Sequence, residues 1–460
     1  MDSTDKFGTA PLGKLLREQA FPASIGILVM SIYGIVDTIF VGRFVGSEAI
    51  GAITVVLPII FLIASIGMAI GVGGASVLSR AIGDKNEDKA FSVFGNQVVM
   101  TILFALFFVV CGYFLMDDII LLFGGKGDIH EPAITYFTII LIGIPFLAWM
   151  MMSNNVIRAE GHPRIAMVVM IVPAIINIFL DPLFILVFDW GLEGAAWATT
   201  ISYIGGALYT IYHFVGGKSP LIINKKYCAL KWSLIKEISG LGAVTLARQG
   251  IISLLSIVLN NALFVYGGEL ALAVYGIISR VMMFAYFPVL GITQGFVPIV
   301  GYNFGARLKE RVKKVVRISI IWASGIAMMI FILLMFFAPA ITSLFTKEMH
   351  LIAATTPAFR LVFLATPLLA VSLIISAYFQ AIGRALPALL LASTKQGFFL
   401  IPLVLILPIY FGLDGIWIAF PIADFGAALV SYIYYKLSTI RYPDGKQLHN
   451  PDVIMDKMDG

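Results

Sequence analysis

The chain has 460 residues, of which 60% are hydrophobic and only 12% are charged. Soluble proteins carry about twice that share of charged residues, so the composition excludes an ordinary soluble globular protein. The formal net charge of +5 comes from basic residues gathered in a few loops, and we therefore expect no nucleic-acid partner.

Apolar stretches long enough to cross a membrane recur along the whole chain. A helix that spans a bilayer needs about 20 mostly apolar residues. The first stretch is too long, and too interrupted by Pro and Gly, for a cleaved signal peptide. The sequence therefore predicts an all-α polytopic membrane protein with twelve transmembrane helices. These are expected near residues 19–42, 49–79, 91–115, 132–156, 165–188, 192–215, 239–267, 270–302, 315–340, 354–380, 387–411 and 414–436.

The positions of Lys and Arg predict the orientation of these helices. Of the 31 basic residues, 24 fall in the two terminal segments and in every second loop, whereas the other loops hold only Arg43, Lys126 and Lys347. Cytoplasmic loops of membrane proteins are rich in Lys and Arg. We therefore expect both termini in the cytoplasm and the chain in the cell (inner or plasma) membrane. The basic run from Arg307 to Arg317 fits a cytoplasmic anchor, although an anionic lipid is an alternative partner.

The two halves of the chain resemble each other at an offset of about 221 residues. Gly-Leu-Glu-Gly at 191–194 matches Gly-Leu-Asp-Gly at 412–415, and the Gly-Ser-Glu at 46–48 matches the Gly-Gly-Glu at 267–269. Gly83 matches Gly305 in the same way. Six spans per half return the chain to its starting side, so the repeats run parallel, as in one known type of transporter.

This symmetry predicts the domain organisation. We expect an N-lobe of six spans at residues 1–216 and a C-lobe of six spans at residues 238–440. A basic cytoplasmic linker at 217–237 joins them, and a polar cytoplasmic tail follows at 441–460.

Two aspartates lie inside apolar spans of the N-lobe. A carboxylate at membrane depth costs a few kcal/mol or more, so it is usually kept for a function. At about 1.5 Å per residue, Asp37 in the first span and Asp181 in the fifth reach a similar depth. Asn177 shares a helix face with Asp181 because it lies four residues earlier. Tyr136 and Thr199, in spans that start from the outer side, fall in the same layer.

These five residues offer two carboxylates, an amide oxygen, a hydroxyl and a phenol, which suit a proton or a hard monovalent cation such as Na⁺. For Na⁺ the expected ligands are Asp37, Asn177, Asp181 and Thr199. The structural alternatives are that Asp181 caps a broken helix before Pro182, that Asp37 pairs with a backbone donor, and that Tyr136 belongs to the interfacial aromatic belt.

The C-terminal half lacks acids at the matched positions, because Ile401-Pro402 stands where Asp181-Pro182 stands in the first repeat. Instead, this half has several charged residues at a similar depth along their spans, with amide side chains close by. A mutually paired structural network is one interpretation, and a substrate site is the other. The residues of this possible C-lobe polar network are Arg248, Arg280, Lys395, Asp424, Gln294 and Gln380.

Several kinds of site are absent from the sequence. None of the five His lies deep in a span, which argues against a His relay and a buried His metal site. The chain has no phosphate loop, no His-Glu-x-x-His and no Gly-x-Ser-x-Gly motif. We therefore expect no enzyme activity and no cofactor, and an ion gradient as the energy source. Cys111 and Cys228 are expected to form no disulfide.

The chain resembles the MATE family, the multidrug and toxic compound extrusion transporters. The Asn177-x-x-x-Asp181-Pro182 element is similar to the DinF-like branch and related bacterial multidrug members. The resemblance covers residues 10–440, and the segments that carry it lie at 32–59, 71–83, 155–167, 177–185, 191–202, 275–306 and 380–390.

The resemblance implies twelve helices in two lobes around a central cleft, and cation-coupled antiport by alternating access. It also implies that Asp37, Asn177, Asp181, Tyr136 and Thr199 form the site for the coupling proton or cation. The C-lobe departs from the NorM branch, whose acidic cation ligands lie on spans 7 and 10. A sodium site of that type is not expected here.

Together these features predict an antiporter that exports amphipathic, often cationic, small organic compounds in exchange for H⁺ or Na⁺, and that works as a monomer in the lipid bilayer. The alternatives are a flippase for a lipid-linked precursor, which a basic central cavity would favour, and a membrane receptor or sensor. The short loops argue against a receptor.

Overall fold

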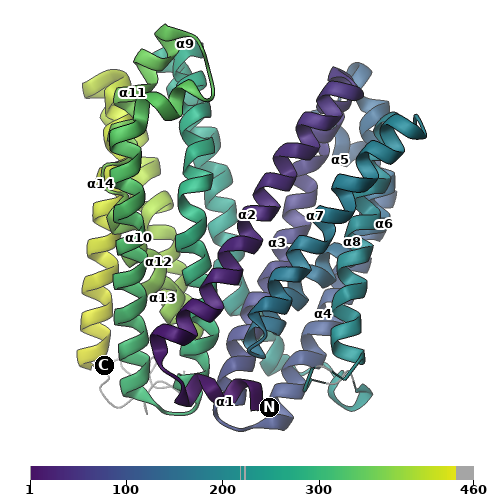
Figure 1. Ribbon diagram of the computed structural model, residues 1–460, viewed down its shortest axis with the longest axis vertical. Helices are drawn as coiled ribbons and strands as arrows, with labels where there is room; N and C mark the ends of the chain where they lie inside the picture. Colours follow the sequence, from purple (N-terminus) through teal and green to yellow (C-terminus); the bar gives the residue numbers. More distant parts are fainter. Residues whose placement is uncertain (1, 218, 222–223, 442–460) are drawn as a thin grey trace, which may run out of the picture.

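The computed structural model describes residues 2–217, 219–221 and 224–441, and within these ranges the chain is helical with no β-strand. The ribbon forms two lobes that lie side by side (Figure 1). The predicted tail falls outside the described residues, apart from the helical Arg441.

The first lobe contains the N-terminal helices and two short helices of other types, η1 and η2. Their bounds are α1 Asp2–Thr9, α2 Leu12–Phe44, α3 Ser47–Gly83, α4 Glu87–Phe114, α5 Met116–Leu122, η1 Gly127–Ile129, α6 His130–Ala159, α7 Pro163–Pro182, η2 Leu183–Val187 and α8 Gly191–Val215.

The second lobe contains the remaining long helices and follows a short 3₁₀ helix, η3, in the linker. The bounds are η3 Lys225–Tyr227, α9 Trp232–Gly305, α10 Lys309–Ser343, α11 Met349–Phe363, α12 Thr366–Ala381, α13 Ala385–Ser393, the π-helical η4 Thr394–Leu400 and α14 Ile401–Arg441. α9 thus begins six residues before the expected start of the C-lobe.

Two of these helices each contain two membrane crossings. α9 reverses at Gly268 (φ 63°, ψ −157°), and α14 turns at Gly412 (φ 57°, ψ −140°). A residue with a Cβ is strained at such positive φ values, which explains the glycines. Both residues lie in the two Gly-containing motifs that recur between the halves, so the repeated motifs mark turns between spans.

The predicted number of twelve transmembrane helices is confirmed. Among the described residues, eight helices are long and apolar enough to cross a membrane, or nine when the bent pair of α11 and α12 counts as one span. α9 and the segment Ala385–Thr439 each hold two crossings. α8 is not counted among these helices, because its sequence is rich in Gly, Ala, Thr and Tyr and is therefore less apolar. It makes the twelfth span.

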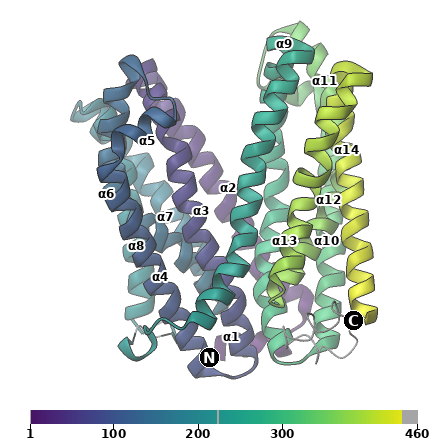
Figure 2. The same ribbon diagram turned by 180° about the vertical axis from the view of Figure 1, so that it is seen from behind.

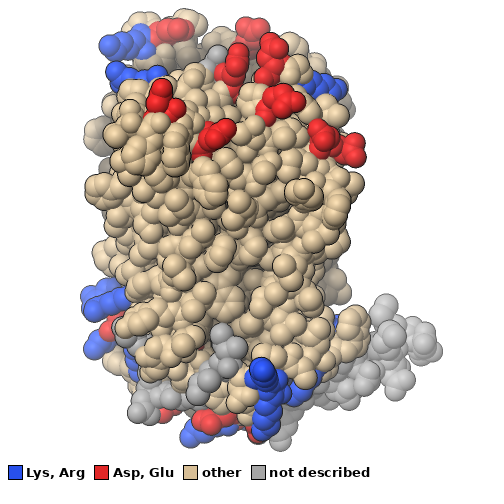
Figure 3. Space-filling model, turned by 90° about the vertical axis from the view of Figure 1, so that its right-hand side faces the viewer, with Lys and Arg blue, Asp and Glu red and all other residues tan. Residues whose placement is uncertain are grey.

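The surface agrees with a membrane protein. On the face seen in Figure 3, Lys, Arg, Asp and Glu gather at the two ends, and a broad band without charged side chains separates them. Large apolar side chains such as Phe107, Phe179 and Phe336 are exposed. Exposed apolar side chains are expected where a helix faces lipid tails rather than water.

The two lobes pack together at one end, which we call the closed end; it carries α1 and the last residues of α14 (Figure 1). One cluster of buried apolar side chains extends from the N-lobe into the part of α9 near Ile238 and near Val300. A second cluster contains only C-lobe residues, such as Leu259 and Phe420. The hydrophobic core is therefore shared between the lobes only near the closed end.

Glycines bring the lobes together at this closed end. A Cβ on Gly242 of α9 would lie 2.6 Å from the carbonyl oxygen of Ala69 on α3, and one on Gly295 would lie 2.8 Å from the backbone nitrogen of Ala20 on α2. By contrast, a Cβ on Gly276 would meet nothing within 4 Å. Gly276 lies eight residues after the reversal of α9 at Gly268. The ribbons of the two lobes diverge toward the end opposite the closed end (Figure 2).

Polar contacts add to this interface. Arg80 Nη1 lies 3.0 Å from Glu237 Oε1, and Ser76 Oγ donates to the carbonyl oxygen of Gln380 at 2.6 Å. Because α3 contributes both Arg80 and Ser76, this helix forms the N-lobe side of these two polar contacts. Cys111 and Cys228 are both free, as expected.

Candidate functional site

The two intramembrane aspartates of the N-lobe come together. The carboxyl groups of Asp37 on α2 and Asp181 on α7 lie within hydrogen-bonding reach of each other. Asp181 is 3% exposed, and Asp37 is half-buried. Pro182 follows directly, and the chain then widens into the π-helix η2. Wide helical turns of this kind are frequent at functional sites.

Asn177 links Asp181 to the neighbouring helix. Its Nδ2 donates to Asp181 Oδ1 at 3.2 Å and to Thr199 Oγ1 of α8 at 3.4 Å. Asn177 and Thr199 are 1% and 4% exposed. The predicted i, i+4 relationship of Asn177 and Asp181 therefore gives a direct contact, and the pair is closed off from solvent.

Tyr136 of α6 joins the same group. It is 3% exposed, and its side chain lies within hydrogen-bonding reach of Thr199. All five residues predicted for the N-lobe site thus lie in one region, contributed by α2, α6, α7 and α8. We call this set of Asp37, Tyr136, Asn177, Asp181 and Thr199 the acidic pocket.

Two further tyrosines belong to the acidic pocket and were missed by the sequence analysis. Tyr33 lies within reach of Thr199, and both Tyr33 and Tyr203 lie close to Asp37. Tyr33 precedes Asp37 by four residues, and Tyr203 follows Thr199 by four. Since residues four apart share a helix face, this spacing was a signal that could have identified both.

Two acceptor atoms in the acidic pocket have no hydrogen-bond donor among the described residues. Asp37 Oδ1 and Asn177 Oδ1 are shielded from solvent and unpaired. Leaving a buried acceptor unpaired costs about 1–3 kcal/mol. A proton shared by the carboxyls, or a small cation bound by oxygen atoms, would satisfy these groups, so the pocket is chemically suited to bind one.

The C-lobe has a different arrangement. Lys395 in η4 and Asp424 in α14 form an ion pair, with Nζ 2.6 Å from Oδ1, and their side chains are 12% and 2% exposed. Lys395 Nζ also lies 5.5 Å from the ring centroid of Tyr286, which permits a cation–π interaction. The C-lobe therefore contains a buried ion pair, whereas the N-lobe contains two neighbouring acids.

The other residues of the possible C-lobe polar network are separate from this pair. Within the described part of the chain, neither Arg248 nor Arg280 forms an ion pair, and Arg280 is exposed. Gln380 Nε2 donates to the carbonyl oxygen of Leu241 at 2.9 Å, so it contributes to packing against α9. Gln294 is half-buried.

The MatE family model matches residues 22–183 and 244–406, one segment in each lobe. The multidrug export protein MepA of Staphylococcus aureus is 28% identical to this chain, over 94% of this chain and 96% of the relative.

Solved structures show the same architecture. One, described as the outward-facing conformation of a multidrug resistance MATE family transporter of the MOP superfamily, has a TM-score of 0.90 at 25% identity, covering 95% of this chain and 98% of its own. A MOP superfamily transporter from Pyrococcus furiosus, described by a binding pocket of reversed polarity that suggests a different function, has a TM-score of 0.88 at 26% identity and the same coverage.

The family model thus matches both repeats and includes most of α2, all of α3 and α7, and α9 from residue 244 onward. The predicted fold, with twelve spans in two pseudo-symmetric lobes, agrees with these structures. The chain belongs to the MatE family and is a membrane transporter rather than an enzyme.

Proposed function

We propose that this chain exports amphipathic, often cationic, organic compounds across the cell membrane in exchange for a proton or a sodium ion. Full-length similarity to relatives named as multidrug export proteins supports the substrate class. The pairing of Asp37 with Asp181 carries the proposal for coupling. Two carboxyl groups in one shielded pocket can exchange a cation without any cofactor.

Competition between the coupling cation and the substrate for the acidic pocket would couple the flux of one to the flux of the other. Cation binding to Asp37 and Asp181 neutralises the charge that a cationic substrate needs, so each ligand lowers the affinity for the other. Such linkage is reciprocal, because it is a difference in binding free energy between two ligands. In the exchange cycle, the outward-open molecule takes up the cation as substrate leaves, and the inward-open molecule reverses the exchange.

We also propose that the closed end faces the cytoplasm. The distribution of Lys and Arg in the loops supports this orientation, and both described ends of the chain lie at that end (Figure 1). The molecule described here is then in its outward-open state. Labelling of single cysteines in the loops of intact cells tests the orientation, and accessible loops at the closed end would contradict it.

Transport in proteoliposomes tests the proposed exchange. The purified protein is reconstituted, a fluorescent organic cation is added, and a pH gradient or a Na⁺ gradient is imposed in separate experiments. We expect substrate movement against its own gradient under one of the two conditions. The ion whose gradient drives the flux is the coupling ion. Flux that follows only the substrate's own gradient would contradict antiport.

A flippase for a lipid-linked precursor is the second candidate. Arg248 and Arg280 of α9 favour it, because neither has an ion-pair partner among the described residues and a lipid phosphate could provide one. The same liposomes, loaded with a fluorescent lipid-linked phosphate, separate the two functions. Lipid flipping that Arg248→Gln abolishes, without dye flux, would establish the flippase instead.

We propose that one chain completes the transport path, because both repeats are present in it. Light scattering of the purified protein, with the detergent contribution subtracted, measures the mass of the protein in the micelle. A mass of one chain in transport-competent preparations supports a monomer, whereas a stable dimer contradicts it.

A further inference from the structure

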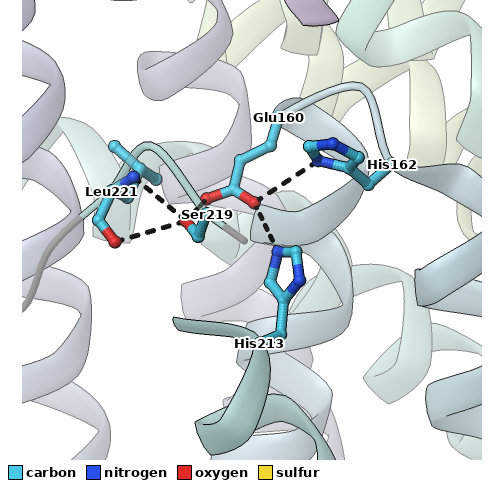
Figure 4. A network of polar contacts seen from close by, with 5 residues as sticks. All are labelled: Glu160, His162, His213, Ser219 and Leu221. Atoms are coloured by element: carbon cyan, nitrogen blue, oxygen red, sulfur yellow. Dashed lines mark hydrogen bonds and ion pairs between the residues drawn. The ribbon is translucent and has the colours of Figure 1, made fainter. Parts of the chain in front are cut away.

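A second cluster of polar side chains, none of which belongs to the acidic pocket, lies where α6 and α8 end and α7 begins (Figure 4). Glu160 follows the end of α6, His162 precedes α7, and His213 lies in the last turn of α8. Ser219, at the start of the linker between the lobes, completes the group. Glu160 is fully buried, and His213 is 2% exposed.

We expected no buried His metal site because no His lies deep in a span, but His213 is buried nevertheless. That expectation used depth along a span as the measure of burial. His213 is near the end of α8, but its ring packs against His162 and Phe214, and the linker residue Ser219 lies beside it at Glu160. Loop packing, which the pattern of apolar spans does not report, therefore buries this histidine.

The distances within the cluster suit a metal ion. Glu160 Oε2 lies 2.9 Å from His213 Nε2 and 3.8 Å from His162 Nδ1, and one ligand atom from each residue lies within 4.8 Å of the others. Tetrahedral zinc has bonds of about 2.0–2.1 Å to nitrogen and oxygen, which separates neighbouring ligand atoms by about 3.3 Å. The observed distances lie on both sides of that value.

The hydrogen bonds of the cluster leave one ligand atom unused. His162 Nδ1 is shielded from solvent and has no hydrogen-bond partner, although it points toward Glu160 (Figure 4). A separation of 3.8 Å is too long for a hydrogen bond. A metal ion between the two atoms would give each of them a partner.

Hydrogen bonds also hold the carboxylate of Glu160 in place. Ser219 Oγ donates to Glu160 Oε1, and the backbone nitrogen of Leu221 donates to Ser219 Oγ at 3.0 Å. Outer hydrogen bonds of this kind fix the orientation of metal ligands.

We propose that Glu160, His162 and His213 bind a divalent transition-metal ion, with Zn²⁺ as the best match to two imidazoles and one carboxylate. The bound ion ties together the ends of α6 and α8 and the start of α7, next to the point where the linker to the second lobe begins. Its role is structural, since it lies outside the acidic pocket.

Metal content and affinity test the site directly. The full-length protein, purified without a histidine tag and stripped with a chelator, is titrated with Zn²⁺ and analysed for bound metal. We expect one ion per chain. The variants His162→Ala and His213→Gln should bind Zn²⁺ at least about tenfold more weakly, because each lacks one ligand.

The matched control is His350→Ala. His350 Nε2 lies 3.6 Å from Glu348 Oε2, but these side chains are 68% and 66% exposed and no third ligand joins them within the described chain. This variant should bind Zn²⁺ like the unmodified protein. If it loses the ion, or if His162→Ala keeps full affinity, the proposed ligands are wrong.

A measurement on the unmodified protein keeps the test valid if a variant fails to fold. Co²⁺ replaces Zn²⁺ in tetrahedral sites and gives strong visible absorption there, whereas octahedral Co²⁺ absorbs weakly. We expect the strong bands at one equivalent of Co²⁺ and their loss on addition of Zn²⁺. No binding above the buffer control would show that the cluster is held by hydrogen bonds alone and would overturn the proposal.

Discussion

Gly83 of α3 and Gly305 of α9 pack against each other's helices across the two lobes. A Cβ on Gly83 would collide with the carbonyl oxygen of Tyr302, and one on Gly305 would collide with the carbonyl oxygen of Arg80. The two glycines occupy matched positions in the repeats. The internal symmetry of the sequence therefore appears in the structure as a reciprocal contact that allows two backbones to approach closely.

This contact predicts that a side chain at Gly305 shifts the molecule away from the state described here. Gly305→Ala places a methyl group against backbone, and such overpacking costs about 1–3 kcal/mol. Each 1.4 kcal/mol changes a two-state ratio about tenfold. We expect the closed end to open more often, with a longer distance between spin labels placed on the two lobes there.

The control for this experiment is Gly276→Ala, on the same helix. A Cβ at Gly276 meets nothing within 4 Å, so the label distance should stay as in the unmodified protein. Unchanged distances in Gly305→Ala would show that the glycine contact does not hold the closed end together.

The acidic pocket predicts that loss of either carboxylate abolishes coupled export. In Asp181→Asn the amide cannot exchange a proton and is a weak ligand for a cation, so we expect at least a tenfold loss of gradient-driven flux. Asp189→Asn is the matched control, because Asp189 is exposed near the next turn. Flux per molecule of reconstituted protein measures the effect, and equal loss in both variants would contradict a specific role for Asp181.

The acidic pocket was largely predictable because its carboxylates stand out against apolar spans. Asp37 and Asp181 are conspicuous, since charge at that depth is rare. Their partners Tyr33 and Tyr203 are not, because tyrosine is common in membrane helices and only the contact with the pocket distinguishes these two. The sequence shows which spans carry costly groups, but it does not show which ordinary side chains surround them.

The C-lobe charges and the His cluster show what sequence patterns leave out. Lys395, Asp424 and Arg280 lie at similar depth along their helices, yet only the first two form a pair, because helix rotation decides which side chains meet. Glu160 and His213 are separated by 53 residues and meet where loops fold over helix ends. Neither periodicity nor depth encodes that packing.

For the Lys395–Asp424 pair, we expect a single substitution to destabilise the protein more than the double substitution does. Removing one partner leaves an uncompensated buried charge, which costs about 3–5 kcal/mol. Lys395→Met alone should therefore lower the Tm of the purified protein markedly. The double variant with Asp424→Leu should recover much of that loss, because a buried ion pair can often be replaced by apolar residues.

Transport by the same double variant separates the two roles considered for the pair. Normal flux together with a recovered Tm indicates a structural pair. Lost flux with a recovered Tm indicates that Lys395 or Asp424 contacts the substrate. The single Asp424→Leu variant should resemble Lys395→Met in stability, because it also leaves one charge buried alone.

Arg311 of α10 makes several hydrogen bonds that stabilise the N-terminal helix α1. Its Nη2 donates to the carbonyl oxygens of Phe7 at 3.0 Å and Ala10 at 2.8 Å, and its Nε donates to Asn303 Oδ1 at 3.0 Å. Glutamine is too short to make all three bonds. In Arg311→Gln we therefore expect faster amide hydrogen exchange in α1, by at least about tenfold if about 1.4 kcal/mol of local stability is lost.

Arg317→Gln is the control for the change of charge, since Arg317 is exposed on the same helix. Exchange in α1 should remain slow in this variant. Because α1 packs on α9 through Phe7 and Tyr302, its release also loosens the closed end, and the distance between spin labels on the two lobes should broaden in Arg311→Gln alone. Equal exchange in the two variants would assign the stability of α1 to the packing of Phe7 rather than to the Arg311 hydrogen bonds.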